Sequence, residues 1–180
     1  MAQTSTRSRS QTAQSKAARA GAQDAIALLK ADHREVEDLF EQFEKSRSED
    51  KKAQLAQKIC QALKMHTKIE EEIFYPAFLE ATGNKDIHHE AEVEHNGAEK
   101  LIAEIEKAGP SDDYFDARVK VLSEMIKHHV HEEEKREGMF AEARDSDMDL
   151  DALGEQLRAR KEELGASDGM DEDTEITFNG

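Results

Sequence analysis

A repeated apolar pattern in the middle of the chain restricts its fold more than any other feature of the sequence. Apolar side chains recur every three or four positions in four separate segments. This spacing places them on one face of an α-helix. The pattern therefore predicts four amphipathic helices, which cover about residues 23–46, 48–82, 86–108 and 112–143.

Short connections between these segments determine how the helices can pack. Gly83-Asn84 and Gly109-Pro110 separate neighbouring segments and leave no room for a long crossover. Pro76 is expected to disturb the end of the second helix. No segment alternates with period two over the length of a strand. The expected fold class is all-α: an up-down-up-down antiparallel four-helix bundle with flexible N- and C-terminal tails.

The two ends of the chain carry opposite charge. Residues 1–23 contain four basic residues and no acidic one, whereas residues 145–180 contain twelve acidic and three basic residues. We therefore predict a disordered basic arm over 1–23, the bundle over 24–144 and an acidic tail over 145–180, with 150–164 as a candidate short helix. An organelle transit peptide is the alternative for the arm, although the arm has no clear apolar face.

The composition of the whole chain excludes several kinds of partner. The formal net charge of -16 opposes both a phosphate backbone and an anionic membrane surface, so we expect neither a nucleic-acid nor a membrane partner. No apolar stretch reaches the roughly 20 residues that a membrane-spanning helix needs. The single cysteine, Cys60, cannot form an internal disulfide. A reduced compartment, and hence a cytoplasmic location, is expected.

The histidines are concentrated in the predicted bundle. All eight lie between residues 33 and 131, and four of them occur once per helix inside the apolar stripe. These four are His33, His66, His95 and His129. One histidine on an apolar face is more often a hydrogen-bonded core residue than a metal ligand. Four at matched positions would meet inside a closed bundle, and this favours a metal centre.

Glutamates follow three of these histidines after one helical turn, so that both side chains share a helix face. The pairs are His66 with Glu70, His95 with Glu99, and His129 with Glu133. A buried carboxylate is costly without a cation. The candidate metal ligands are therefore His33, His66, Glu70, His95, Glu99, His129 and Glu133. On the fourth helix, His128 with Glu132 offers the same spacing and remains an alternative. His88, His89 and His131 are expected to face solvent.

The types of candidate ligand favour particular metals. Imidazole and carboxylate without thiolate suit iron or manganese better than structural zinc. Six or seven candidate ligands are too many for one ion, which implies a dinuclear centre. A ferritin-like centre needs two Glu-x-x-His motifs, and this chain has one, from Glu92 to His95. The zinc-protease motif His-Glu-x-x-His is absent, and no separate catalytic residue is predicted.

Four motifs together resemble the hemerythrin-like family, also called HHE cation-binding domains. They are Asp32-His33-Arg34-Glu35, the run from His66 to Pro76, Glu94-His95 and the run from His128 to Glu134. The resemblance covers about residues 24–143. It implies that His33, His66, Glu70, His95, His129 and Glu133 hold two non-haem iron ions, in preference to manganese, with both glutamates as bridges. The oxygen carriers of the family have a second histidine where this chain has Glu99, and this departure argues against simple reversible oxygen carriage.

The resemblance leads to one main hypothesis about function. It implies a non-haem di-iron protein that binds dioxygen or a related small oxidant in the bundle core, for sensing, storage or protection against oxidative stress. A di-iron enzyme that decomposes hydrogen peroxide or reduces nitric oxide is the first alternative. A metal-responsive regulatory module, which would meet a protein partner through its charged tails, is the second. The sequence leaves open whether the protein is an enzyme.

Overall fold

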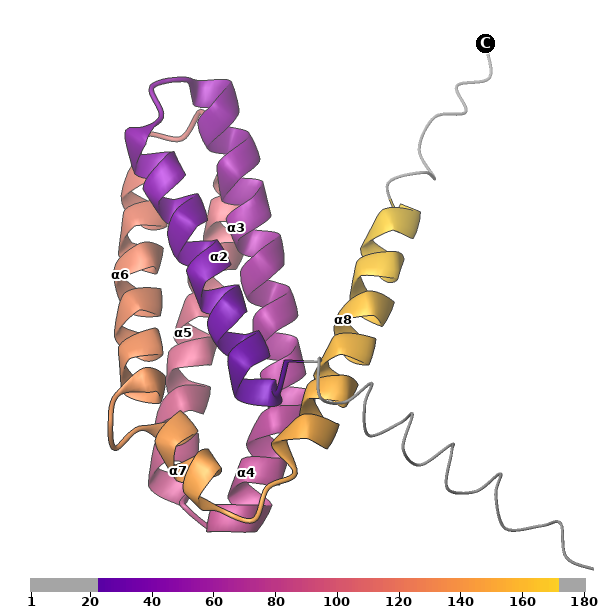
Figure 1. Cartoon of the computed structure of the whole chain (residues 1–180). Helices are drawn as coiled ribbons and strands as arrows, with labels where there is room; N and C mark the ends of the chain where they lie inside the picture. The colour runs from indigo at the N-terminus through magenta and orange to yellow at the C-terminus, as the bar shows by residue number, and fades with distance from the viewer. Residues whose placement is uncertain (1–22, 172–180) are drawn as a thin grey trace, which may run out of the picture.

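The bundle contains four long helical segments (Figure 1). The computed structural model describes residues 23–171, and within this range it contains helices and no strands. The segments are α2 (Ala25–Lys45); α3 (Glu49–Ile69), continued by η1 (Glu70–Phe74) and α4 (Tyr75–Thr82); α5 (Lys85–Ala108); and α6 (Phe115–Glu134). Each packs against the next, and α2 packs against α6 to close the ring. The predicted all-α, up-down-up-down bundle is confirmed. The predicted basic arm lies, except for Gln23, outside the described residues.

Polar side chains fix where the helices begin. Asp24, Ser48 and Asn84 precede α2, α3 and α5, and each accepts a hydrogen bond from a backbone N–H in the first turn of its helix. Gly83 ends α4 with a φ of 67°, a left-handed conformation that glycine adopts without steric cost. These caps explain why the observed bounds of the first three helical segments lie close to the predicted ones.

The second helical segment contains one wide turn, the π-helix η1. The backbone N–H of Tyr75 donates to the carbonyl of Glu70, five residues earlier, instead of four as in an α-helix. Pro76 follows directly and has no N–H to donate. The disturbance expected at Pro76 therefore takes the form of a π turn just before it. Such turns occur frequently at functional sites, and both Glu70 and Tyr75 are buried here.

The fourth helix is shorter than predicted. The expected helix over 112–143 is wrong at both ends, because α6 covers only Phe115–Glu134 and a separate helix, α7, covers Met139–Asp145. Gly138 lies in the connection between them. A Cβ atom at this position would lie 2.2 Å from the Glu132 carbonyl oxygen. The chain turns back closely against the end of α6, and this turn requires glycine.

A fifth long helix packs against the bundle through its N-terminal part and leans away from it toward its C-terminal end (Figure 1). The expected short helix over 150–164 is observed as the longer α8 (Leu150–Asp171), which packs beside α2, α3 and η1 (Figure 1). Leu153 and Leu157 are buried in this contact. This part of the predicted acidic tail is therefore a packed element, because two leucines spaced by four share an apolar face. Residues 172–180 of that tail lie outside the described residues.

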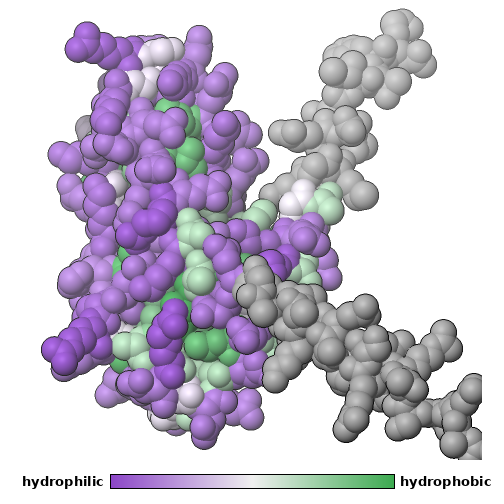
Figure 2. Space-filling model, viewed as in Figure 1, coloured by the Kyte–Doolittle hydropathy of each residue, from purple (hydrophilic) through white to green (hydrophobic). Residues whose placement is uncertain are grey.

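Two apolar clusters form the core, and the polar residues lie between them. The first cluster includes Val36, Leu63 and Ile126, and the second includes Leu29 and Ile69. The histidines of α2 and α3 occupy the positions between these apolar residues along each helix. Most of the visible surface is hydrophilic, with narrow hydrophobic strips (Figure 2). No helix among the described residues is long and apolar enough to cross a membrane.

Candidate metal centre

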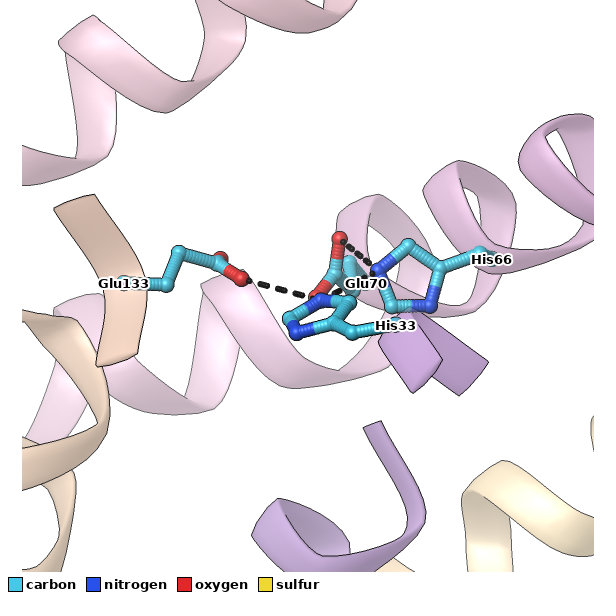
Figure 3. A group of neighbouring side chains, drawn as sticks. All are labelled: His33, His66, Glu70 and Glu133. Atoms are coloured by element: carbon cyan, nitrogen blue, oxygen red, sulfur yellow. Dashed lines mark hydrogen bonds and ion pairs between the residues drawn. The ribbon is translucent and has the colours of Figure 1, made fainter. Parts of the chain in front are cut away.

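Six buried polar side chains meet between the two apolar clusters. They are His33 from α2, His66 from α3, Glu70 from η1, His95 from α5, and His129 and Glu133 from α6. None is more than 6% exposed. Figure 3 shows the side chains of four of them, His33, His66, Glu70 and Glu133, pointing toward one another. The structure therefore brings together six of the seven candidate ligands.

The four histidines form two pairs. The Nε2 atoms of His33 and His66 are 3.1 Å apart, and those of His95 and His129 are 3.2 Å apart. We name these pairs the His33/His66 half and the His95/His129 half. All four Nε2 atoms thus face the interior. Two groups of residues could each hold a metal ion, one in each half, and both groups include Glu70.

The two glutamates connect the halves. Each carboxylate places an oxygen near one histidine of each pair. The distances from Oε2 to Nε2 are 3.2 Å for Glu70 to His66, 3.4 Å for Glu70 to His95, 3.4 Å for Glu133 to His33, and 3.7 Å for Glu133 to His129. This is the position that carboxylates bridging two ions would occupy.

Some oxygen atoms of these glutamates lack partners. Glu70 Oε1 and Glu133 Oε2 are buried and accept no hydrogen bond from the described residues. An unpaired buried carboxylate oxygen is costly, and a cation removes that cost. The site therefore fits metal cations, since two histidine pairs and two shared carboxylates supply nitrogen and oxygen ligands.

Each histidine ring is also held from its outer side by a second carboxylate. The Nδ1 distances are 2.8 Å from His33 to Glu134, 3.5 Å from His66 to Asp32, 3.1 Å from His95 to Glu71, and 2.7 Å from His129 to Glu94. In each case the carboxylate comes from the neighbouring helical segment, and the four contacts follow the ring of helices around the bundle. Metal-binding histidines typically have such a partner, which fixes the ring so that the other nitrogen faces the metal.

The mutual contacts shift several pKa values. Burial, together with the charge of Glu70, raises the pKa of Glu133 to about 8. Burial disfavours protonation of His66, but the charge and hydrogen bond of Glu70 and the hydrogen bond of Asp32 outweigh it and raise the His66 pKa to about 10. Burial and the neighbouring His66 charge lower the pKa of His33 to about 4. Without metal, Glu133 and His66 therefore hold protons at neutral pH, and a bound cation would displace them.

Tyr75 also belongs to the site, and sequence reasoning missed it. Its hydroxyl oxygen lies 3.1 Å from His95 Nε2, 3.1 Å from Glu133 Oε1 and 3.3 Å from Glu70 Oε2. Burial and the two carboxylates raise the pKa of Tyr75 well above its usual value, so the hydroxyl keeps its proton. Tyr75 follows Glu70 by five positions, a spacing that only a π turn brings to one face. A tyrosine just before Pro76 was the available signal.

The outer carboxylates were also missed, although they carry a simple signal. Asp32, Glu71, Glu94 and Glu134 are each adjacent in sequence to one of the six central residues. A neighbour along a helix points about 100° away from the central residue, toward the adjoining helix. Each of these four side chains therefore contacts a histidine of another helix rather than the centre itself.

The structure corrects the prediction that Glu99 joins the other candidates. Glu99 is exposed on α5, because the buried stripe continues from His95 through Ala98 and Ile102. Burial also distinguishes His129 from His128. His129 is buried, whereas the side chain of His128 is 63% exposed and its Nε2 lies 3.3 Å from Glu94.

Comparison with known proteins gives a consistent result. Residues 24–143 match the hemerythrin HHE cation binding domain family. A DNA nickase from Nostoc sp. is 29% identical over 119 residues, which are 66% of this chain and 33% of the nickase. The chain thus spans about a third of that curated relative. The crystal structure of a hemerythrin HHE cation binding domain-containing protein from Mycobacterium kansasii has the same fold, with a TM-score of 0.65 and 19% identity over 85% of this chain and 94% of that one. This chain therefore belongs to the hemerythrin HHE cation-binding domain family.

Proposed function

We propose that this chain holds two iron ions between its two histidine pairs and binds dioxygen or a related small oxidant there, for sensing, storage or protection against oxidative stress. The observation that carries the proposal is the pair of buried glutamates, Glu70 and Glu133, each with an oxygen that lacks a hydrogen-bond partner among the described residues. Four inward Nε2 atoms surround them. One cation in each half would satisfy both groups.

The ligand types support iron in particular. The site offers imidazole and carboxylate and no thiolate, since Cys60 is buried in the first apolar cluster. Such ligands suit iron, which when bound supplies one-electron chemistry and open coordination positions for a small oxidant. A reduced compartment, predicted from the single cysteine, would favour loading with ferrous iron.

The surrounding residues would control what reaches the centre. Phe74 and Phe140 are buried in the second apolar cluster, and the Phe140 ring stacks on His33 at one end of the candidate centre. A cavity of about 260 Å³ reaches His129 and Glu133 from the surface. This volume is ample for a small oxidant and lies just below the range of about 300–1,000 Å³ found for pockets that bind drug-sized ligands.

One observation favours the enzymatic alternative, decomposition of hydrogen peroxide or reduction of nitric oxide. The Tyr75 hydroxyl lies within hydrogen-bond distance of Glu133 and His95 and keeps its proton. Tyr75 is a buried O–H group beside the candidate ligands, and it could donate a hydrogen bond to an oxidant bound there. Oxygen evolution from peroxide by the iron-loaded protein, and none from the metal-free protein, would support this alternative.

The first test of the proposal is iron content. The wild-type chain, loaded anaerobically with ferrous iron and desalted, is expected to retain about two ions, because two ligand groups share the bridging carboxylates. Glu70→Gln should retain fewer, since it removes the charge from a carboxylate shared by both groups. Glu99→Gln is the matched control, as Glu99 is exposed and lies outside the centre. Equal iron in all three proteins would contradict the assignment.

An optical spectrum then tests whether the iron-loaded protein binds dioxygen reversibly or is oxidised by it. A charge-transfer band that appears in air and disappears under argon supports reversible binding of dioxygen. A band that appears and persists indicates oxidation to ferric iron and favours the peroxide or nitric oxide alternative. No band in an iron-loaded sample would contradict both.

A further inference from the structure

An acidic cavity opens from the surface to one half of the metal centre. It lies between α5 and the connection from α6 to α7, and its volume is about 260 Å³. The buried residues His129 and Glu133 line its inner end. Glu90 and Glu137, both exposed, line its outer end. The cavity thus joins solvent to residues of the proposed iron site.

The charge of the lining is strongly negative. Besides Glu133 at its inner end, four glutamates line the cavity, Glu90, Glu94, Glu132 and Glu137, against one lysine. That lysine, Lys135, forms an ion pair with Glu132 and so offsets only part of the charge. Clefts lined by one sign of charge and walled by low-dielectric protein concentrate ions of the opposite sign and accelerate their arrival.

The inner end of the cavity contains side chains that can bind a cation. Glu133 is 2% exposed, and its Oε2 atom has no hydrogen-bond partner among the described residues. The imidazole of His129 lies beside it, with Nε2 3.7 Å from that oxygen. An acidic surface alone would only attract counter-ions. Here the acidic walls end at a buried carboxyl group with one oxygen that lacks a hydrogen-bond partner among the described residues, which distinguishes this cavity from an ordinary charged surface.

We infer that this acidic cavity is the entry route for divalent cations, through which ferrous iron reaches the centre from the side of His95 and His129. The inference rests on the proposed function, because it assumes that the centre holds iron. Glu90 and Glu137 would collect the hydrated ion at the surface, and Glu94 and Glu132 would guide it inward. Lys135 would slow its entry, since it is the single cation in the lining.

The rate of iron uptake tests the route. Ferrous iron is mixed anaerobically with the metal-free full chain at low salt, and iron that remains free is followed with a colorimetric chelator. Glu90→Gln/Glu137→Gln should take up iron about 3–10 times more slowly than wild type, because electrostatic steering changes association rates by about 10-fold or more. Its final iron content should equal that of wild type, since neither residue belongs to the six central ones.

Two further variants exclude a general effect of charge. Glu124→Gln/Glu162→Gln removes the same charge from exposed residues of α6 and α8 that do not line this cavity, and it should take up iron at the wild-type rate. Lys135→Gln should take up iron faster, by about 2–5-fold. The differences should shrink as salt is added, because salt screens exposed charges.

The outcomes separate this inference from the proposed function. If Glu90→Gln/Glu137→Gln loads at the wild-type rate and wild type still retains iron, the route is wrong and the proposed function stands. If the control slows as much as the cavity variant, net charge and not the cavity determines the rate, and the route is again wrong. If wild type retains no iron, the proposed function fails, and the route fails with it.

Discussion

The two halves of the candidate metal centre share two carboxylates, Glu70 and Glu133, but differ in the charge around their histidines. In the His33/His66 half, both outer carboxylates are neutralised: Lys161 Nζ lies 2.6 Å from Asp32 Oδ1, and Arg34 Nη2 lies 2.6 Å from Glu134 Oε1. In the His95/His129 half, Glu71 and Glu94 pair with no lysine or arginine among the described residues. The His95/His129 half therefore keeps more negative charge beside the Nδ1 atoms of its histidines.

Access to the two halves differs as well. The ring of Phe140 stacks on His33 with a centroid distance of 5.8 Å, and α8 packs against α2 and α3, the helices of the His33/His66 half. The other half contacts the Tyr75 hydroxyl and opens into the acidic cavity. Outer carboxylates make an imidazole a stronger donor, and neutralising them weakens this effect. We therefore expect the His95/His129 half to bind its cation more tightly and to stabilise the higher oxidation state.

The largest effect on metal affinity is expected from removing a single histidine, from either half in turn. His33→Ala should lose the ion of its own half and retain the other, whereas His129→Ala should lose the tighter-bound ion. Each affinity should fall by more than about 100-fold, because even the loss of an outer partner costs about 10–100-fold. Calorimetric titration with ferrous iron, done anaerobically, resolves the two binding events. If either variant keeps both wild-type affinities, the two halves are not separate sites.

Neutralising an outer carboxylate should have the next largest effect. Glu94→Gln should lower the affinity of its half by about 10–100-fold, and Asp32→Asn should lower that of the other half by less. The difference arises because Lys161 already offsets the charge of Asp32, while no lysine or arginine of the described chain offsets Glu94. The same titration measures both variants. An effect of Asp32→Asn that exceeds that of Glu94→Gln would reverse the proposed order of the halves.

Much of the fold could be predicted because periodicity and turn residues act locally. The apolar stripes and caps such as Asp24 and Asn84 depend on neighbours within one turn. The break after Glu134 could not be predicted in the same way, because the need for Gly138 arises only from its close approach to the end of α6. The packing of α8 depends likewise on distant contacts of Leu153 and Leu157.

The candidate ligands could be predicted where they follow the regular four-residue spacing of an α-helix. Glu70 lies four residues after His66 and turns inward as expected, since the π turn begins only there. Glu99 has the same spacing from His95, but the buried stripe of α5 continues through Ala98, so Glu99 faces solvent. Spacing alone does not distinguish these two cases, because the choice depends on the exact direction of the neighbouring helices.

Removal of the Tyr75 hydroxyl tests the His95/His129 half with a smaller expected effect. Tyr75→Phe should destabilise the metal-free protein by about 1–2 kcal/mol, because it leaves buried polar partners of the hydroxyl unsatisfied. The hydroxyl contacts His95, Glu70 and Glu133 but neither histidine of the other half. The metal affinity of the His95/His129 half should therefore change more than that of the His33/His66 half, which is reached only through the shared glutamates. Urea unfolding measures the first effect and anaerobic titration the second.

A matched control is available for this substitution. Tyr114 is 68% exposed, and Tyr114→Phe should change the free energy of unfolding by less than about 0.5 kcal/mol. A Tyr75→Phe protein as stable as this control would show that the hydroxyl contributes nothing to the metal-free site. Equal affinity changes in both halves would show that Tyr75 does not distinguish them.

The smallest effect on metal affinity is expected from replacing Lys161, the cation that pairs with Asp32 beside His66. Lys161→Gln leaves the charge of Asp32 unbalanced, so His66 should become a stronger donor and its half should bind metal about 2–5-fold more tightly. The two halves should then become more alike in affinity. Arg160→Gln is the control, because Arg160 also joins α8 to the bundle, through Glu72 at 2.7 Å, but not through a partner of a central histidine. The Arg160–Glu72 pair is exposed, and the Lys161–Asp32 pair is partly buried at the edge of the bundle. Ion pairs that solvent reaches contribute only about 0–1 kcal/mol to stability, so neither variant should unfold. If both variants change the affinity equally, the docking of α8 and not the charge on Asp32 sets the difference between the halves.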